Sequence, residues 1–407
     1  MKSRLLAILL STLLLNLAAC GNKDAPAPTA GAGAPAATPE EVVKIGAVQP
    51  LTGPQSHLGK DFENGIRLAV DDANAKGLTI AGKKVKFELV SEDDQADPKT
   101  ATIVAQKLVD AKVAGVIGHL NSGTTIPASK IYADAGIPQI SPSATNPKYT
   151  EQGFKTAFRV MPNDVQQGKV LGDYAVGKLN AKSIAIIDDR TSYGQGVADQ
   201  FEKAAKAAGA QIVAREFTTD KSTDFMAILT AVKAKKPDLL FFGGMDAQAG
   251  PMVKQMRSLG LAAKFLGGDG MSTPEFIKLA TGGAEDAYSS LPGLPLDKMP
   301  GGKAFGDRFS AKHGQIQLYA PYCYDAVSVL VAAMQKADST DPAKYLPALA
   351  ATSHEGVTAK VAFDAKGDIK DGAVTLYQVK NGKWEVLETV GGPAPAAPAE
   401  AAPAPAK

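Results

Sequence analysis

Short runs of apolar residues alternate along the chain with longer segments in which apolar residues recur every three or four positions. Runs such as Ile184-Ala185-Ile186-Ile187, bounded by turn residues, are typical of strands that are buried on both faces of a parallel sheet. The strands predicted in this way are residues 42–48, 85–90, 113–117, 138–140, 183–187, 211–217, 238–242 and 264–266.

The segments between these strands have the period of amphipathic helices. The first of them carries Phe62, Ile66 and Val70 on one face, and the second begins with Asp97 and Pro98, which suit an N-cap and a first helical position. The predicted helices are residues 58–75, 98–109, 126–135, 195–208, 224–235, 247–260 and 274–281. The alternation of strand and helix runs twice, so we predict an α/β fold with two doubly wound parallel-sheet lobes.

From residue 288 the pattern changes to helices, which are followed by two strands joined at Asn381-Gly382, a typical hairpin turn. These helices are residues 302–313, 322–336 and 342–351, and the strands are residues 373–379 and 384–388. Helices without a sheet of their own must pack on an earlier unit, so the chain is expected to cross between the lobes more than once. Lobes joined by several crossovers close around a ligand by hinge motion. The expected division is a first lobe of residues 41–161 and 292–372 and a second lobe of residues 162–291 and 373–390.

The two ends of the chain have compositions that do not fit a packed domain. Residues 1–19 have a basic start and an apolar stretch too short for a transmembrane span, as in a signal peptide. Leu17-Ala18-Ala19-Cys20 resembles the lipobox of bacterial lipoproteins, which implies lipidation of Cys20 and a lipid-anchored protein at the cell envelope; a plain signal with a chance cysteine is the alternative. Residues 20–40 and 391–407 are rich in Ala and Pro and are expected to form a disordered tether and tail.

Charge and cysteine content exclude some classes of function. Without Lys2 and Arg4 of the signal, the 44 basic residues become 42, equal to the 42 acidic ones. No basic run stands out, so nucleic acid is not an expected partner. Apart from Cys20 the chain has only Cys323, which we expect to be a buried small hydrophobe.

Two loops rich in hydroxyl groups follow predicted strands of the first lobe, at residues 118–125 and 140–147. Parallel strands bring such loops to one edge of the sheet, where ligands of open α/β sheets bind. The amides at the start of the helix after Ser122 suit a carboxylate or phosphate. The alternative is that both loops are ordinary connections with good N-caps, and that Ser122 is one of these caps.

Motifs of catalysis and metal binding are not found. The four histidines, His57, His119, His313 and His354, are scattered without metal-ligand spacing, and His119 is expected to be a packed neighbour of the first loop. The carboxylate pairs at residues 93–94 and 188–189 are expected at solvated strand ends. We therefore predict no enzyme, no metal and no cofactor.

Residues 42–390 resemble the family of periplasmic leucine–isoleucine–valine-binding proteins, the substrate-binding components of branched-chain amino acid ABC transporters. The matching stretches are residues 93–98, 116–122, 127–129, 140–145, 193–196 and 265–270. The resemblance implies the type I periplasmic-binding fold, an apolar amino acid as ligand, a permease as partner and a monomer in the periplasm. A sensory receptor for amino acids or amides on the same fold is the alternative function.

The resemblance also implies roles for single residues. Ser122 and Thr145 would hold the α-carboxylate through hydroxyls and main-chain amides, in a loop that includes Ala144. The carbonyl of Ser143 and the hydroxyl of Thr145 would accept from the α-ammonium group, and Asp269 would supply its countercharge. Tyr193 would reach across the cleft onto the ligand. Asp269 as a turn aspartate and Tyr193 as an exposed loop aromatic are the alternatives.

Several positions depart from the family pattern. Leu58 and Met245 stand where well-known members have aromatic residues, and Tyr319 replaces a phenylalanine, so the side-chain pocket is expected to be wider and to contain an added hydroxyl donor. Ala96 and Asn121 replace a cysteine pair, so the loop before Ser122 is expected to be held by packing alone.

Overall fold

The computed structural model describes residues 40–392. The predicted signal peptide, Cys20, the tether up to residue 39 and the tail from residue 393 lie outside the described residues. The first described strand begins at Glu40 and the last ends at Gly391, so the ordered part exceeds the predicted tether and tail boundaries by one or two residues.

The first sheet has six strands in the order β2-β3-β1-β4-β5-β6. All neighbours pair in parallel except β2, which is antiparallel to β3. Its central strand β4 is buried along its whole length, as the apolar run around residue 116 predicts. The strands are β1 (Glu40–Gln49), β2 (Thr79–Ile80), β3 (Lys83–Asp93), β4 (Gly115–Gly118), β5 (Gln139–Ser141) and β6 (Ala157–Arg159).

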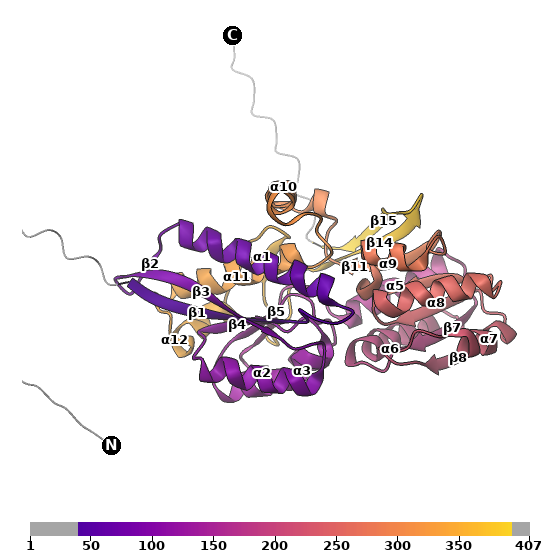
Figure 1. The fold of residues 1–407 in the computed structure, drawn as a ribbon, viewed down its shortest axis with the longest axis horizontal. Helices are drawn as coiled ribbons and strands as arrows, with labels where there is room; N and C mark the ends of the chain where they lie inside the picture. The colour runs from indigo at the N-terminus through magenta and orange to yellow at the C-terminus, as the bar shows by residue number, and fades with distance from the viewer. Residues whose placement is uncertain (1–39, 393–407) are drawn as a thin grey trace, which may run out of the picture. The chain divides into compact units, whose positions relative to one another are not determined.

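Helices cover both faces of this sheet (Figure 1). On one face lie α1 (Ser56–Ala75) and α11 (Ala320–Lys336), and on the other α2 (Pro98–Asp110) and α3 (Ser122–Asp134). The buried apolar residues of α2 and α3 form one cluster with Val48 and Val116 of the strands. Asp97 caps α2 by accepting from the Thr100 N–H, as predicted. Shorter helices are α4 (Lys148–Glu151), α10 (Gly302–His313) and α12 (Pro342–Ala350).

The second sheet has seven strands in the order β15-β14-β11-β10-β9-β7-β8. Strands β11, β10, β9, β7 and β8 are parallel, while β14 and β15 form an antiparallel hairpin at Asn381-Gly382, both with positive φ. The strands are β7 (Ser183–Asp188), β8 (Gln211–Phe217), β9 (Leu239–Gly243), β10 (Lys264–Gly267), β11 (Ala287–Pro292), β14 (Ala373–Lys380) and β15 (Lys383–Gly391). Its helices are α5 (Asp164–Gly177), α6 (Ser192–Ala207), α7 (Met226–Ala234), α8 (Asp246–Ser258) and α9 (Pro274–Ala280).

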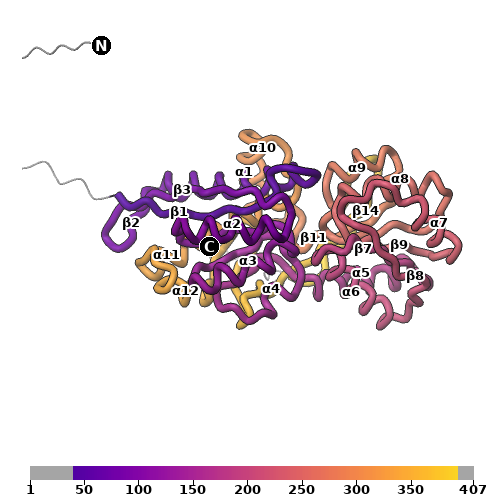
Figure 2. The backbone as a smooth tube through the Cα atoms, turned by 60° about the horizontal axis from the view of Figure 1, so that its bottom comes forward, coloured from indigo at the N-terminus to yellow at the C-terminus, as the bar shows by residue number. Residues whose placement is uncertain are grey.

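The chain passes between the sheets three times: after β6, after β11 and before β14. Figure 2 shows α11 and α12, late in the chain, beside β1, from its start. Tyr345 of α12 donates a hydrogen bond to the Ala114 carbonyl next to β4, so these late helices pack with the first sheet. Cys323 on α11 is buried, as predicted.

Several elements differ from the sequence prediction. Helix α5 was not expected: it opens with an N-cap at Asn163, but Gly168 and Gly172 interrupt its apolar pattern. These glycines let it pack closely on α6, since a Cβ on Gly168 would lie 2.5 Å from the Gln200 Cβ. Residues 288–292, interpreted as the start of a purely helical segment, belong to β11, and that segment also contains the small hairpin of β12 (Ser353–Glu355) and β13 (Lys360–Ala362).

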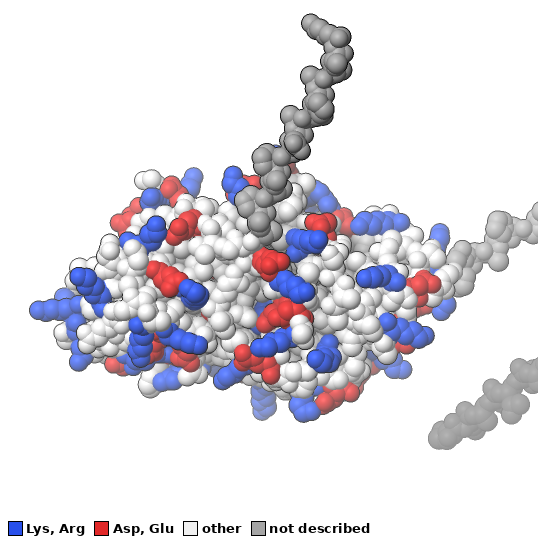
Figure 3. Space-filling model, turned by 180° about the vertical axis from the view of Figure 1, so that it is seen from behind, with Lys and Arg blue, Asp and Glu red and all other residues white. Residues whose placement is uncertain are grey.

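Surface charge is mixed. On the face shown in Figure 3, Lys and Arg side chains are interspersed with Asp and Glu. None of the helices within residues 40–392 is both long and apolar enough to cross a membrane.

Candidate functional site

The two hydroxyl-rich loops lie side by side. Helix α3 begins at Ser122, four residues earlier than predicted, directly after the end of β4 and its loop. The amides of Ser122 and Gly123 have no intrahelical acceptor, whereas those of Thr124 and Thr125 bond the Asn121 carbonyl. The Asn146 N–H donates to Ser122 Oγ (3.2 Å), and Ser143 Oγ donates to the Leu120 carbonyl (2.7 Å). Ser122 is thus not the N-cap, which is Asn121, and its hydroxyl proton stays available for a ligand.

Thr145 occupies the centre of the second loop. Its side chain is fully buried, and Oγ1 lies beside the Asp164 carboxyl group without a hydrogen bond of normal geometry to any group of residues 40–392. Its carbonyl accepts from the Asp164 N–H (2.8 Å). The neighbouring Ala144 has both backbone groups occupied, its N–H by Ser141 Oγ and its carbonyl by Arg159. Because a buried hydroxyl without a partner is costly, Thr145 Oγ1 marks a place for a polar ligand group.

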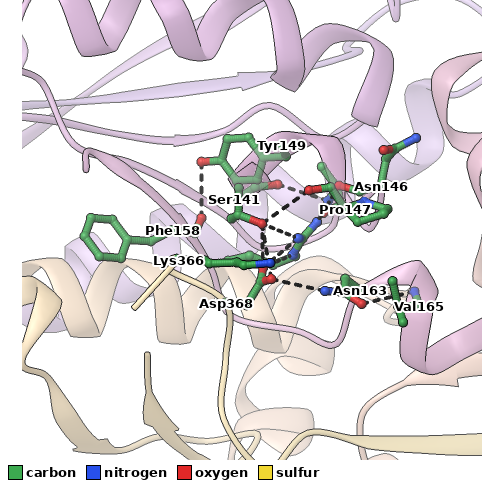
Figure 4. Close-up of polar contacts among 12 residues, drawn as sticks. Ser141, Asn146, Pro147, Tyr149, Phe158, Asn163, Val165, Lys366 and Asp368 are labelled. Atoms are coloured by element: carbon green, nitrogen blue, oxygen red, sulfur yellow. Dashed lines mark hydrogen bonds and ion pairs between the residues drawn. The ribbon is translucent and has the colours of Figure 1, made fainter. Parts of the chain in front are cut away.

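Arg159 supports the loop around Thr145 through hydrogen bonds to its main chain. Its guanidinium is fully buried, and Nη1 donates to the carbonyls on both sides of Thr145, those of Ala144 (2.7 Å) and Asn146 (2.9 Å). Nε and Nη2 donate to Asp368 Oδ1 at 2.9 and 2.6 Å. In Figure 4, Asp368 lies at the centre of these contacts and also faces Asn163. Neither Arg159 nor Asp368 was predicted as a site residue, although a lone cation in the apolar stretch around β6 is a visible signal.

Asp269 is the second centre of the site. It begins the short 3₁₀ turn η1 (Asp269–Met271) and is fully buried. Oδ1 accepts from the Tyr193 hydroxyl (2.9 Å) and Gln167 Nε2 (3.0 Å), and Oδ2 accepts from the Tyr319 hydroxyl (2.8 Å). Burial raises the pKa of Asp269, and these donors partly offset the shift. Asp269 is therefore a clustered, buried carboxyl group and not a solvated turn aspartate.

Tyr193 and Tyr319 approach Asp269 from different parts of the chain. Tyr193 lies on α6, beside the second sheet that also carries Asp269, and its hydroxyl accepts from the Gly270 N–H (2.8 Å). Tyr319 immediately precedes α11, which packs on the first sheet. The hydroxyl that bridges the two sheets at Asp269 is therefore that of Tyr319, and it is not an unpartnered donor in the side-chain pocket as the sequence suggested.

Asp164 connects the two centres. This first residue of α5 is fully buried, and neither carboxyl oxygen has a hydrogen-bond partner within the described residues. Burial raises its pKa to about 8, although the adjacent Thr145 hydroxyl lowers it, and the nearby charge of Asp269 adds to the rise. Asp164 and Gln167 were not predicted as site residues because α5, which carries both, was not predicted.

The predicted pocket residues share one hydrophobic cluster. Leu58, Met245, Tyr193 and Tyr319 are all buried members of it. Met245 precedes α8 and lies next to Tyr193, because a Cβ on Gly270 would be 2.7 Å from Met245 Sδ and 2.8 Å from the Tyr193 ring. Met245 thus places an apolar side chain beside the polar groups around Asp269, while Leu58 is buried elsewhere in the same extended cluster.

The loop before Ser122 is held by hydrogen bonds, contrary to the expectation of packing alone. Asn121 Nδ2 donates to Gln55 Oε1 (2.8 Å), and the hydroxyls of Thr125 and Ser141 both donate to the His119 carbonyl (3.0 Å each). The His119 ring is buried between Asp94 Oδ2 (2.9 Å) and the Tyr132 hydroxyl (3.0 Å), so it is a packed neighbour as predicted.

The carboxylate pairs were misinterpreted as solvated. Asp94, Asp188 and Asp189 are buried, and only Asp93 is partly exposed. Asp189 accepts from the Thr191 N–H and Asp188 from the Arg190 N–H, so they hold the turn before α6. Within residues 40–392 no group of three or more His, Cys, Asp or Glu side chains is arranged to hold a metal ion.

A second bridge between the sheets joins His57 of α1 to Asp246 of α8. His57 Nε2 lies 2.7 Å from Asp246 Oδ2, which also accepts from the Thr273 hydroxyl (2.6 Å). Burial lowers the pKa of His57, but the hydrogen bond and charge of Asp246, with smaller contributions from the Glu275 and Asp61 carboxylates, raise it above its ordinary value of 6.5.

This bridge predicts pH-dependent ligand affinity. Because the raised pKa belongs to the arrangement in which His57 meets Asp246, the ion pair contributes fully below pH 6.5 and is lost as the pH rises through the raised value. Affinity for the ligand should therefore fall with rising pH more steeply in the wild type than in His57→Gln, which keeps a donor but cannot titrate. Calorimetric titration of both proteins between about pH 5.5 and 9 measures the difference, and parallel profiles would contradict it.

Comparisons with known proteins show the family of the chain. A family model described as "Periplasmic binding protein" matches residues 42–383. An "Amino acid binding protein" of Pseudomonas aeruginosa is 39% identical over 85% of this chain and 92% of its own length. The "Leucine-, isoleucine-, valine-, threonine-, and alanine-binding protein" of the same organism is 33% identical over 83% of this chain and 90% of its length. Among solved structures, the transporter substrate-binding protein LivJ of Streptococcus pneumoniae, in complex with isoleucine, has a TM-score of 0.78 and 32% identity, covering 86% of this chain and all of its own.

Proposed function

The chain belongs to the family of periplasmic binding proteins, and from this premise we propose that it captures branched-chain or related apolar amino acids in the cleft between its two sheets and delivers them to the permease of an ABC importer. Two relatives support the class of ligand, since one is named for binding leucine, isoleucine, valine, threonine and alanine and the other is in complex with isoleucine.

The observation that carries the proposal is the separation of opposite polar groups within one buried region. The loops around Ser122 and Thr145 present hydroxyl and amide donors, which suit a carboxylate. Asp269 presents a buried carboxyl group, which suits an ammonium group. Asp164 contacts the Thr145 backbone and is near enough to Asp269 for their charges to interact, so both centres serve one small zwitterion.

The side-chain preference follows from the apolar residues predicted for the pocket. Leu58 and Met245 favour an alkyl side chain, because each buried CH₂ contributes about 0.8 kcal/mol. Met245 can adapt its shape, so larger apolar amino acids should be tolerated. Calorimetric titration of stripped protein with leucine, isoleucine, valine, phenylalanine and glutamate tests this. Binding of glutamate without leucine would overturn the proposed ligand class, and binding of none of them would overturn the function.

Single hydroxyl deletions should weaken binding. Ser122→Ala and Thr145→Ala each remove a hydroxyl proposed to bond a charged ligand group, a contact of about 1.5–3 kcal/mol, so leucine affinity should fall roughly ten- to a hundredfold. The melting temperature of the unliganded protein should change little for Thr145→Ala, because its hydroxyl bonds no group of residues 40–392. A large loss of unliganded stability with unchanged affinity would identify them as structural hydroxyls.

The proposal extends to the cell envelope. We propose that Cys20 is lipidated and anchors the protein on a membrane surface, through a tether long enough to leave the cleft in water. Mature protein from its native host should then partition into detergent, and Cys20→Ala should abolish this. A wild-type mature N-terminus that is unmodified, or away from Cys20, would exclude the anchor.

A further inference from the structure

Tyr319 is positioned by the part of the molecule that packs on the first sheet. Asp61 of α1, itself fully buried, accepts four successive main-chain N–H groups at the turn before α11. Its oxygens lie at 2.8, 3.1, 2.9 and 3.0 Å from the nitrogens of Gln317, Leu318, Tyr319 and Ala320. This clamp ties the Tyr319 backbone to α1, so the hydroxyl extends from a rigid support.

Asp269 is positioned by the second sheet and its helices. Gln167 of α5 donates to Asp269 Oδ1 and accepts from the Asp269 N–H (3.0 Å), while Ser290 Oγ donates to the same Gln167 oxygen (3.0 Å). Tyr193 of α6 donates to Oδ1. These contacts therefore fix the orientation of the Asp269 carboxyl group independently of Tyr319.

The 2.8 Å bond from the Tyr319 hydroxyl to Asp269 Oδ2 thus joins two separately supported groups. A carboxylate accepts about four hydrogen bonds, and three are made here, two at Oδ1 and one at Oδ2. The position that remains is on Oδ2, next to the Tyr319 oxygen, which has acceptor capacity of its own. A bound ammonium group would contact both.

We propose that Tyr319 is a positioning residue that couples recognition of the ligand's ammonium group to closure of the cleft. This inference rests on the proposed function. When the sheets separate, Asp269 keeps Tyr193 and Gln167 but loses the Tyr319 donor, so one oxygen of the buried carboxyl group is left incompletely bonded. Closure restores that bond and places a second acceptor beside the ammonium group, so binding and closure stabilise each other.

Tyr319→Phe removes the hydroxyl and leaves the ring. Leucine affinity should fall roughly tenfold or more, since the lost bond is to a charged group. Tyr322→Phe is the matched control. Tyr322 lies in the first turn of α11, which directly follows Tyr319, and is equally buried, but its hydroxyl has no partner within the described residues. This control should keep wild-type affinity.

A compensating variant separates positioning from a general structural role. Asp269→Glu lengthens the carboxyl side chain by one carbon. It should weaken binding of leucine, because the Tyr319 hydroxyl occupies the space that the longer side chain needs. In the Tyr319→Phe background that space is vacated, so Asp269→Glu should recover affinity at least tenfold relative to Tyr319→Phe alone. Two residues in contact are expected to show such non-additivity.

Calorimetric titration of leucine against the wild type, the three single variants and the double variant is the test. If the wild type binds leucine and Tyr319→Phe binds it with the same affinity, the inference is overturned and the proposed function stands. The same holds if the losses of affinity in the double variant are additive. No binding by the wild type overturns both. Equal losses in Tyr319→Phe and Tyr322→Phe show a packing effect and likewise overturn the inference.

Discussion

Replacing Arg159 with methionine is expected to lower the free energy of unfolding by about 3–5 kcal/mol, the usual cost of removing one partner from a buried ion pair. The change leaves Asp368 without its cation, removes the donor of the Ala144 carbonyl, and leaves the Asn146 carbonyl with only the Tyr149 N–H. Since these carbonyls flank Thr145, the loop is also released, and leucine affinity should fall in the protein that remains folded. Urea denaturation and calorimetric titration measure the two effects.

Arg308→Met is the control for this prediction. Arg308 also donates two hydrogen bonds to a carboxylate, that of Asp72, but its side chain is 48% exposed, whereas that of Arg159 is fully buried. Exposed pairs contribute about 0–1 kcal/mol, so this variant should remain close to wild type in stability and affinity. Equal losses in the two variants would contradict the role assigned to burial.

Asp269→Asn is expected to have the largest effect on binding. It removes the countercharge proposed for the ammonium group while keeping the size of the side chain and one acceptor oxygen for Tyr193 and Gln167. Truncating a buried charged partner costs about 2–5 kcal/mol, so leucine affinity should fall about 30-fold or more. The unliganded protein should lose little stability, because burial already disfavours the ionised carboxyl group and raises its pKa.

Asp325→Asn provides the matched comparison. Asp325 is equally buried, but it accepts from the main chain and hydroxyl of Thr358 and from the Val357 N–H, away from the proposed site. Its replacement should lower stability without changing leucine affinity. Wild-type affinity in Asp269→Asn would show that the carboxyl group does not meet the ammonium group.

The pattern of the sequence was sufficient for the architecture. Strands buried on both faces need apolar residues at every position, and helices on a sheet need one apolar face, so both periods are visible locally. The predicted strand at 211–217 and helix at 302–313 coincide with β8 and α10. Helix α5 was missed because its contact surface is built from glycines, which leave no apolar period.

The candidate site was predicted only where its signal is local. Ser122 and Thr145 stand in hydroxyl-rich loops directly after strands, and topology alone brings such loops to one edge of the sheet. The structure adds which of their groups are occupied and which are open, since that depends on neighbours such as Arg159 and Asn146.

The tertiary structure alone determined which polar side chains pair with residues that are distant in the sequence. His57 meets Asp246 after 189 positions, and Arg159 meets Asp368 after 209. A charged residue has the same local pattern whether it is solvated or buried with a partner, which is why Asp188 and Asp189 were expected in water and are buried. The sequence therefore determined the sheets and the loops that end them, because burial leaves a period along the chain. The supports of those loops, and the hydrogen bonds that join the two sheets, were set by the folded arrangement, because hydrogen-bond pairing between distant residues leaves no such period.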